Sequence, residues 1–258
     1  MKRLKRFPDS RRELHLPDPR RFLKRALIII VAVAVLGAGL AASLAFFTGA
    51  CQIRRVNFTG NKYLTPDYLK QISGIESYSN LVTLPVGKVA RNLETNPWVR
   101  GVQVQRHLLH TVNIHIAERE PVAVLDCGGA GFLVDGDGFA IAQVPNDQFK
   151  ELPRVHGGVA KAPNIGAKVT DAKILACLRV IKSMPQSVRG LLLLGNPFDG
   201  RGPVFITSLG FNIVYGAAQD FASKNEELEA IIVDVKNNKR KIAYIDLRVP
   251  DSPVIKPI

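Results

Sequence analysis

Asp135-x-Asp137-Gly138 is the run of residues that comes nearest to a metal site in this chain. Two carboxylates one residue apart, followed by glycine, begin a calcium-binding loop, which also needs oxygen ligands at its fifth and twelfth positions. Those positions hold Phe139 and Asn146. Because Asp-Gly pairs are typical of tight turns between strands, a turn is the simpler interpretation.

The other candidates for chemistry are a glycine run and three histidines. Gly128-Gly129-Ala130-Gly131 lacks the spacing of a phosphate-binding loop and precedes a predicted strand. His107, His110 and His115 have no carboxylate or Cys at matching spacing, so we interpret them as surface residues of a hairpin. Motifs of serine hydrolases and zinc proteases do not occur in the sequence. We therefore expect no catalytic residue, no metal, no cofactor and no small-molecule substrate.

The three cysteines leave two interpretations open. Cys127 and Cys177 fall in the same predicted domain outside the membrane, where a disulfide is allowed. Cys177 also lies in an apolar helical pattern, which is typical of a small buried thiol. Cys51 follows the apolar run described below.

The positive charge of the chain is concentrated in its N-terminal tail. The 258 residues include 35 Lys or Arg and 22 Asp or Glu, a net charge of +13, and 47% of them are apolar. Residues 1–25 hold ten Lys or Arg against three acidic residues, which is +7. The apolar share excludes a disordered chain. Because the remaining charge is dispersed, we expect no binding of nucleic acid.

A long apolar run follows this tail and predicts a transmembrane helix over residues 26–48. Its 22 residues from Ala26 to Phe47 carry no charge and would span about 33 Å as a helix, against about 30 Å of hydrocarbon. Three alternatives stay open: a cleaved signal peptide, a lipoprotein signal ending at Cys51 and a buried helix. The length of the run favours a membrane span.

The Lys and Arg counts on either side of the run predict the orientation in the membrane. Residues 6–25 carry seven Lys or Arg, whereas residues 51–70 carry four. The positive-inside rule then places residues 1–25 in the cytoplasm, as a basic tail near anionic lipid of the bilayer, and residues 51–258 outside the plasma membrane.

The sequence of residues 51–120, directly after the apolar run, predicts two helices between a strand and a hairpin. Thr65-Pro66 starts a helix that Gly74 ends, with Tyr68, Leu69 and Ile72 facing inward. The other elements are a helix over 86–93 and strands over 54–59, 99–105 and 112–117. This β-α-α-β-β order over residues 51–120 indicates a small sheet with two helices on one face.

A second domain is predicted from Pro121 onward, over residues 121–258. Amphipathic helices are expected over 171–184 and 219–235. Strands are expected over 122–125, 132–134, 139–142, 191–194, 204–207, 211–215 and 241–249. The fold class is α+β: a transmembrane helix, the β-α-α-β-β domain and a mixed-sheet β domain with two helices.

Seven short motifs behind the apolar run point to one family. They are Arg55-Val56-x-Phe58-x-Gly60-Asn61, Pro97-Trp98-Val99, Val102-x-Val104-x-Arg106, Glu118-Arg119-x-Pro121-Val122-Ala123, Val134-Asp135-x-x-Gly138, Leu152-Pro153 and Ile245-Asp246-Leu247-Arg248. In this order they resemble the FtsQ/DivIB family of bacterial cell-division proteins, over about residues 21–255. The resemblance implies a POTRA (polypeptide-transport-associated) domain at residues 51–120 and an FtsQ-type β domain at residues 121–258.

The resemblance also implies a partner site at the last strand, where the family engages the small division proteins FtsB and FtsL. The implied residues are Tyr244, Ile245, Asp246, Leu247, Arg248 and Val249. A strand at the edge of a sheet can accept a partner strand by β-augmentation, and Arg248 is the candidate contact to an acidic partner side chain.

Other matched residues have structural interpretations. Gly60 and Gly138 are expected to be turn glycines, and Trp98 after Pro97 a domain-core anchor. Glu118 and Arg119, just before Pro121, are expected to form an ion pair that fixes the angle between the two domains. Lys224 matches a helix lysine of the family and is expected on a solvated face.

The combined interpretation is a non-enzymatic membrane scaffold of the division septum that recruits other division proteins and so helps to control septal peptidoglycan synthesis. One alternative is a POTRA protein of polypeptide secretion or outer-membrane assembly, which would need a long β-barrel. The other is an anchored cell-wall enzyme, which would need a catalytic group.

Overall fold

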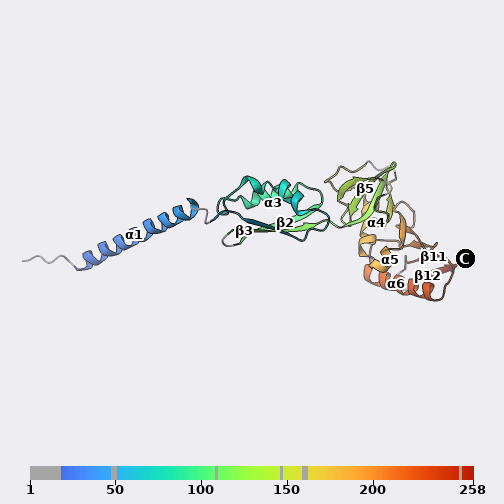
Figure 1. Ribbon diagram of the computed structural model, residues 1–258. Coiled ribbons are helices and arrows are strands. Elements are labelled where there is room, and N and C mark those ends of the chain that lie inside the picture. The colour runs from blue at the N-terminus through green and yellow to red at the C-terminus, as the bar shows by residue number, and fades with distance from the viewer. Residues whose placement is uncertain (1–18, 48–50, 108–109, 146–147, 159–161, 250–251) are drawn as a thin grey trace, which may run out of the picture.

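The computed structural model describes residues 19–47, 51–107, 110–145, 148–158, 162–249 and 252–258. These residues form three parts in a row, which are a long helix, a small domain and a larger domain that ends at the C-terminus (Figure 1). Most of the predicted basic tail, residues 1–18, lies outside the described residues, as does residue 48.

The N-terminal helix α1 (Pro19–Phe47) is long and apolar enough to cross a membrane over Leu23–Leu44. It begins before the predicted span, at a proline, and proline is favoured in the first helical position. Lys24 and Arg25 therefore lie inside the helix. The long side chains of such residues can reach the polar interface at the end of a membrane span.

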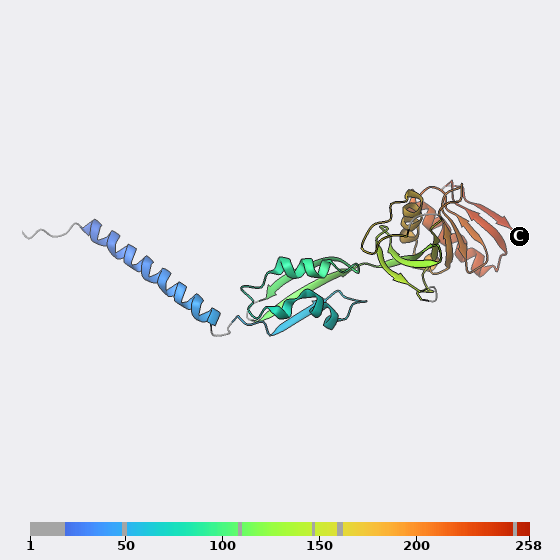
Figure 2. The ribbon, with the colours of Figure 1, turned by 90° about the horizontal axis from the view of Figure 1, so that it is seen from above.

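The small domain confirms the predicted β-α-α-β-β order. Its elements are β1 (Arg55–Thr59), α2 (Pro66–Ser73), a short 3-10 turn η1 (Ile75–Ser77), α3 (Val86–Glu94), β2 (Val99–His107) and β3 (Thr111–Glu118). The sheet order is β1-β3-β2, with β1 parallel and β2 antiparallel to β3. Both helices lie on one face of this sheet (Figures 1 and 2).

The ends of α2 follow from its sequence. The Thr65 hydroxyl accepts from the backbone N–H of Tyr68 at 3.4 Å, and Gly74 ends the helix at φ +66°. Leu69 is buried as predicted, but Tyr68 is exposed, which corrects the expectation that it faces inward. Adjacent helical residues are about 100° apart, so Tyr68 falls outside the stripe that buries Leu69 and Ser73.

The larger domain contains a nine-stranded mixed sheet. The strands are β4 (Pro121–Cys127), β5 (Ala130–Asp135), β6 (Ala140–Val144), β7 (Arg154–His156), β8 (Leu192–Asn196), β9 (Val204–Thr207), β10 (Asn212–Val214), β11 (Ile242–Asp246) and β12 (Val254–Pro257). Their order is β12-β11-β10-β9-β8-β7-β4-β5-β6. The helices are α4 (Ala172–Ser183), α5 (Gln186–Arg189) and α6 (Phe221–Asn237). The predicted α+β class is thereby confirmed.

The main core of this domain combines the sheet with α4 and α6. Leu125 of β4, Ile181 of α4, Leu228 of α6 and Ile245 of β11 belong to one buried cluster. A second cluster contains Val124 of β4 with Leu133 of β5 and with Ile141 and Val144 of β6. Because successive residues of β4 enter different clusters, this strand is buried on both faces, which explains its continuous apolar sequence.

Three elements of the larger domain were not predicted, and each is short. They are β7, α5 and β12, of three or four residues each. Hydrophobic periodicity needs several residues to be visible, and prolines flank or end β12. The last of these omissions changes the interpretation of the partner site.

Candidate functional site

The C-terminal end of the nine-stranded sheet is the candidate partner-binding surface. There β11 pairs in parallel with β10 on one side and antiparallel with β12 on the other. Among the described residues, β12 pairs with β11 alone, and all four of its residues are exposed. β12 therefore forms the edge of the sheet, with a row of backbone N–H and C=O groups facing outward.

The structure corrects the expectation that residues 244–249 form the edge strand. The first three belong to β11, which is an inner strand, and Arg248 and Val249 lie in a bend after it. Ile245 and Leu247 are buried, Tyr244 and Asp246 are half-buried, and Arg248 and Val249 are exposed. The missed signal was the β-branched pair Val254-Ile255 beside Pro253, because edge strands tolerate proline.

Two central residues of β12, Ile255 and Lys256, lie on opposite faces of the sheet. Ile255 pairs with buried Ile245 and therefore lies on the face of the main core, at its rim. Lys256 pairs with Tyr244 on the other face, and its Nζ lies 5.8 Å from the centroid of the Tyr244 ring. The edge thus offers apolar surface on one face and positive charge on the other.

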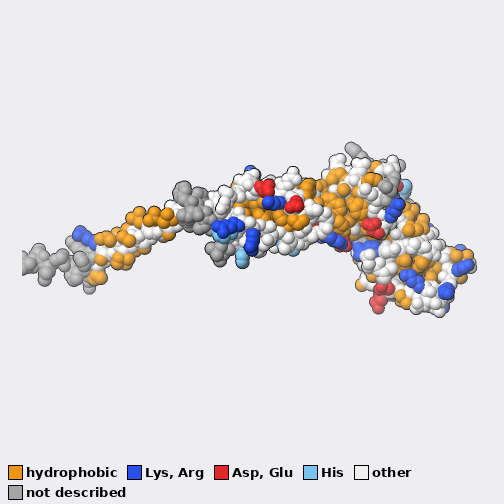
Figure 3. Space-filling model, viewed as in Figure 1, with side chains coloured by type: hydrophobic (Ala, Val, Ile, Leu, Met, Phe, Trp, Pro, Cys, Tyr) orange, Lys and Arg blue, Asp and Glu red, His pale blue; other side chains and the backbone are white. Residues whose placement is uncertain are grey.

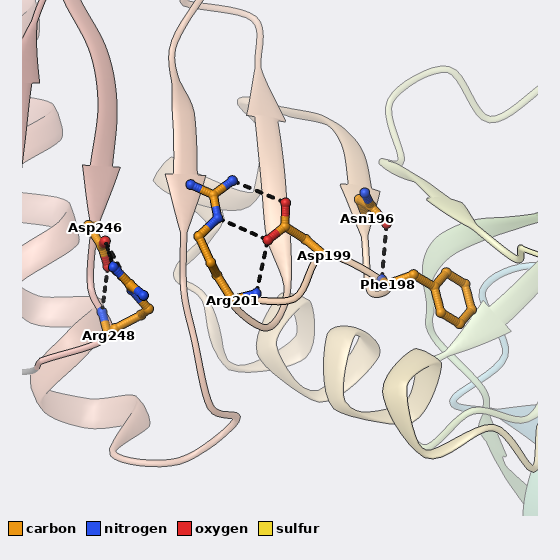
Figure 4. Close-up of polar contacts among 6 residues, drawn as sticks. All are labelled: Asn196, Phe198, Asp199, Arg201, Asp246 and Arg248. Carbon is orange, nitrogen blue, oxygen red and sulfur yellow. Dashed lines mark hydrogen bonds and ion pairs between the residues drawn. The ribbon is translucent and has the colours of Figure 1, made fainter.

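Two Asp–Arg pairs stand at one end of the strands of this sheet, one directly after β11 and the other between β8 and β9 (Figure 4). Arg248 Nε and Nη2 donate to the carboxylate of Asp246 at 3.0 and 2.8 Å. Arg201 donates in the same way to Asp199 at 2.9 and 3.0 Å, in the turn between β8 and β9. The predicted partner contact Arg248 is thus already bonded within the chain.

Both carboxylates of these pairs are acids of lowered pKa. The hydrogen bonds from Arg201 lower the pKa of Asp199 to about 2. Burial acts to raise the pKa of Asp246, but the hydrogen bonds and charge of Arg248 outweigh it and the pKa lies below its usual range. Asn196 stabilises the turn between β8 and β9 that holds Asp199, because its side-chain oxygen accepts from the N–H of Phe198 at 3.0 Å (Figure 4).

A second candidate site is the junction between the two sheets. Arg119 Nη1 lies 2.9 Å from Asp135 Oδ2, and its guanidinium lies 3.6 Å from the centroid of the Phe139 ring. Asp135 Oδ1 also accepts from the N–H groups of Asp137 and Phe139 at 3.0 and 2.8 Å. Arg119, the residue directly after β3, is therefore fixed to the turn between β5 and β6.

Glu118 and Arg119 do not pair with each other, which corrects the expected ion pair. Glu118 accepts from the N–H groups of Tyr63 and Leu64 at 2.7 and 3.0 Å, inside the small domain. Successive residues of an extended chain point in opposite directions, so the two side chains reach different domains. Of these two residues, only Arg119 makes an ion pair with the larger domain, and Arg100 of β2 makes a second, more exposed one with Asp137.

Trp98 also belongs to this junction rather than to the core of the small domain alone. Its ring lies 4.8 Å from that of Tyr63 and packs against the cluster of Val124 and Leu133 in the second sheet. The neighbouring Pro97 lies next to Gly166 of the larger domain: its Cγ is 3.7 Å from the position that a Cβ on Gly166 would take. Pro121 begins β4 opposite Asp135.

The predicted turn interpretation describes the Asp135–Gly138 segment well. Asp135 pairs with Arg119, while Asp137 lies 2.8 Å from Lys182 and 3.4 Å from Arg100. The hydrogen bond from Lys182 lowers the pKa of Asp137. Gly138 has φ +83°, as a tight turn requires. The described residues contain no group of three His, Cys, Asp or Glu that could hold a metal ion.

The cysteines are free thiols in the structure. Cys127 and Cys177 are buried, and burial raises the pKa of Cys177 to about 12. Of the two interpretations left open by the sequence, the structure therefore has separate buried thiols. Cys51 is only half-buried.

Lys224 corrects the expectation of a solvated helix face. Its side chain is 1% exposed, and Nζ donates to the carbonyls of Tyr215 and Ala217 at 3.1 and 3.0 Å. Burial lowers its pKa. Lys224 thus ties α6 to the segment after β10 and positions the strands that lead to the candidate edge.

Comparison with known proteins agrees with this architecture. Residues 51–119 match the family described as POTRA domain, FtsQ-type. The cell division protein FtsQ of Bartonella bacilliformis is 27% identical over 77% of this chain, and that of Anaeromyxobacter sp. (strain K) is 33% identical over 59%. The chain spans 61% and 54% of the lengths of these two relatives. DivIB of Clostridium acetobutylicum is 23% identical over 78% of this chain and 81% of its own length.

The fold and these matches define the class first. The chain is a POTRA protein with a second mixed-sheet domain and an N-terminal helix long and apolar enough to span a membrane. Its relatives are named FtsQ or DivIB along most of its length. The chain is thus similar to the FtsQ/DivIB family of bacterial cell-division proteins over most of its length, as the sequence motifs predicted.

Proposed function

We propose that the protein is a non-enzymatic scaffold of the bacterial division machinery. The observation that carries the proposal is the FtsQ-type POTRA domain directly behind a helix that can span a membrane. Helix α1 anchors it in the plasma membrane, with the basic tail, residues 1–25, on the cytoplasmic side and residues 51–258 outside. At the septum it binds membrane division proteins of the FtsB and FtsL type and so helps to control peptidoglycan synthesis.

The end of the sheet formed by residues 244–249 and β12 is the proposed partner site, with β12 as the strand that receives the partner. A partner strand added there would pair with the outward backbone groups of β12. It would also cover Ile255 at the rim of the core. Exposed Lys256 favours a partner segment that carries acidic side chains, whereas the charge of Arg248 is already offset by Asp246.

Partner capture by the full-length chain from a detergent extract of dividing cells tests this site. Ile255→Asp places a charge on the apolar rim, and we expect it to abolish capture of the FtsB- and FtsL-type proteins. Leu209→Asp is the matched control, because Leu209 is 44% exposed against 39% for Ile255 and lies in the turn between β9 and β10. Equal capture by both variants would contradict the site.

Two further measurements test the role as a whole. A fluorescent fusion of the full chain should form a band at midcell in dividing cells, and a uniform membrane signal would contradict a septal role. The purified protein should leave isolated cell wall intact, and clear hydrolysis would contradict the non-enzymatic interpretation.

A further inference from the structure

The end of the POTRA domain that faces α1 is built from segments that the topology brings together. β1 and β3 are parallel and β2 is antiparallel, so the start of β1, the start of β3 and the end of β2 share this end. The N–H of Ile53 donates to Ser79 O at 2.8 Å, and that of Leu81 donates to Cys51 O at 2.7 Å. We call residues 51–55, 76–88, 105–107 and 110–111 the membrane-end surface.

This surface lies close to the membrane if α1 spans it. Four chain steps from Phe47 to Cys51 reach at most about 14 Å. The backbone N–H groups of Arg54 and Arg55 both donate to His110 O, so the strand that follows is bound to the hairpin tip. Charges on the surface therefore stand within one or two Debye lengths of the headgroups, since the Debye length is about 8 Å at physiological salt.

The charge of the domain is polarised toward this end. The membrane-end surface holds four Lys or Arg, namely Arg54, Arg55, Lys88 and Arg106, against one acidic residue. That residue, Glu76, is paired with Lys70 at 2.8 Å. In the space-filling view, Lys, Arg and His side chains gather at the end of the domain nearest α1 (Figure 3).

The acidic residues of the domain mark its opposite end. Apart from Glu76, those of residues 51–120 are Asp67, Glu94, Glu118 and Glu120. They stand at the start of α2, the end of α3, the end of β3 and just after it. These positions follow or precede the strand ends remote from α1, so the charge gradient runs along the length of the domain.

We propose that the membrane-end surface docks on anionic phospholipid headgroups of the bilayer that α1 crosses, and so sets how the exported domains stand on the membrane. Arg54 and Arg55 are both exposed and carry the contact. Exposed Val82 lies in the same surface and reaches the boundary of the headgroups. The inference rests on the proposed membrane anchor and goes beyond partner binding.

The test uses the full chain reconstituted in vesicles and a fluorescent label at residue 82. Val82→Cys is labelled in a Cys51→Ser background, because the other two cysteines are buried. Nitroxide-labelled headgroups quench the label when it approaches the bilayer. We expect more quenching in vesicles containing phosphatidylglycerol than in phosphatidylcholine alone, and a loss of this difference at high salt.

Arg54→Gln/Arg55→Gln should lower the extent of docking by about fivefold for each arginine removed. Lys236→Gln/Lys241→Gln is the matched control, since it removes the same charge from exposed positions of the larger domain. Equal quenching in the two lipids, or an equal loss in the control, would overturn the proposal. Resistance of the chain to carbonate extraction separates the outcomes: extraction would refute the anchor itself, whereas an extraction-resistant chain indifferent to lipid charge would refute docking alone.

Discussion

The ion pair between Arg119 and Asp135 should be the strongest single polar contact across the domain junction. Its N–O distance is 2.9 Å, and the two side chains are only 15% and 7% exposed. Removing one partner of a buried pair typically costs about 3–5 kcal/mol. In Asp135→Asn the amide oxygen can still accept from the N–H groups of Asp137 and Phe139. We therefore expect the low end of this range, about 3 kcal/mol.

Trp98 provides the assay for this variant. It is the single Trp of the chain and packs at the junction against the second sheet. Urea unfolding of the detergent-solubilised chain, followed by Trp fluorescence, should shift to lower urea in Asp135→Asn. Lys182→Met is the control, because its pair with Asp137 is about half exposed and such pairs contribute about 0–1 kcal/mol.

A double-mutant cycle with Arg119→Met decides whether the loss comes from the pair. Arg119→Met also removes the contact with the Phe139 ring, worth about 1–2 kcal/mol, so its own cost should be at least as large. If the pair carries the effect, the two changes together should cost about 2 kcal/mol less than their sum. Additive losses, or a loss in Lys182→Met as large as in Asp135→Asn, would refute the reasoning.

Three further outcomes are expected. Gly60→Ala should cost about 2 kcal/mol or more in urea unfolding and Gly210→Ala about 1 kcal/mol, because both have positive φ but only the Cβ at residue 60 would lie 2.3 Å from a carbonyl oxygen. Burial lowers the pKa of Lys224 in the folded chain, so between that lowered pKa and 10.5 the unfolded chain binds more protons and the free energy of unfolding rises with pH. Lys224→Met should flatten this rise in urea unfolding measured over that pH range. A maleimide should label Cys51 in the folded chain and Cys177 only after unfolding, as mass spectrometry would show.

The small domain was predictable because its signals are local. A capping threonine, a proline at the first helical position and a helix-ending glycine bound α2 within ten residues of sequence. Strands β2 and β3 show their buried faces by alternation, with Ile114 and Ile116 buried. The family resemblance also implied a POTRA domain here, which the match of residues 51–119 to the FtsQ-type POTRA family bears out.

The contacts that define the candidate sites were less accessible, because they depend on long-range pairing. No local pattern tells that Arg119 meets Asp135 rather than Glu118. Lys224 is a charged residue on an amphipathic helix, and only the two carbonyls that it meets explain its burial. In the same way, β12 is too short to show a period, and its pairing with β11 makes it the edge.

The two ends of the nine-stranded sheet differ in a way that supports a strand-accepting role for β12. At the β6 end, the N–H of Ala140 donates to Ala167 O and its carbonyl accepts from Gly166, so the chain covers part of its own edge. Across the described residues at the other end, β12 pairs with β11 alone, and Val254 and Ile255 are exposed. An uncovered, apolar edge invites uncontrolled pairing, and proteins usually blunt it with charge, cover or a bulge. β12 carries part of this protection in Lys256, Pro257 and the irregular pairing with β11, but Val254 and Ile255 stay uncovered, and a partner strand in the assembled complex would cover them.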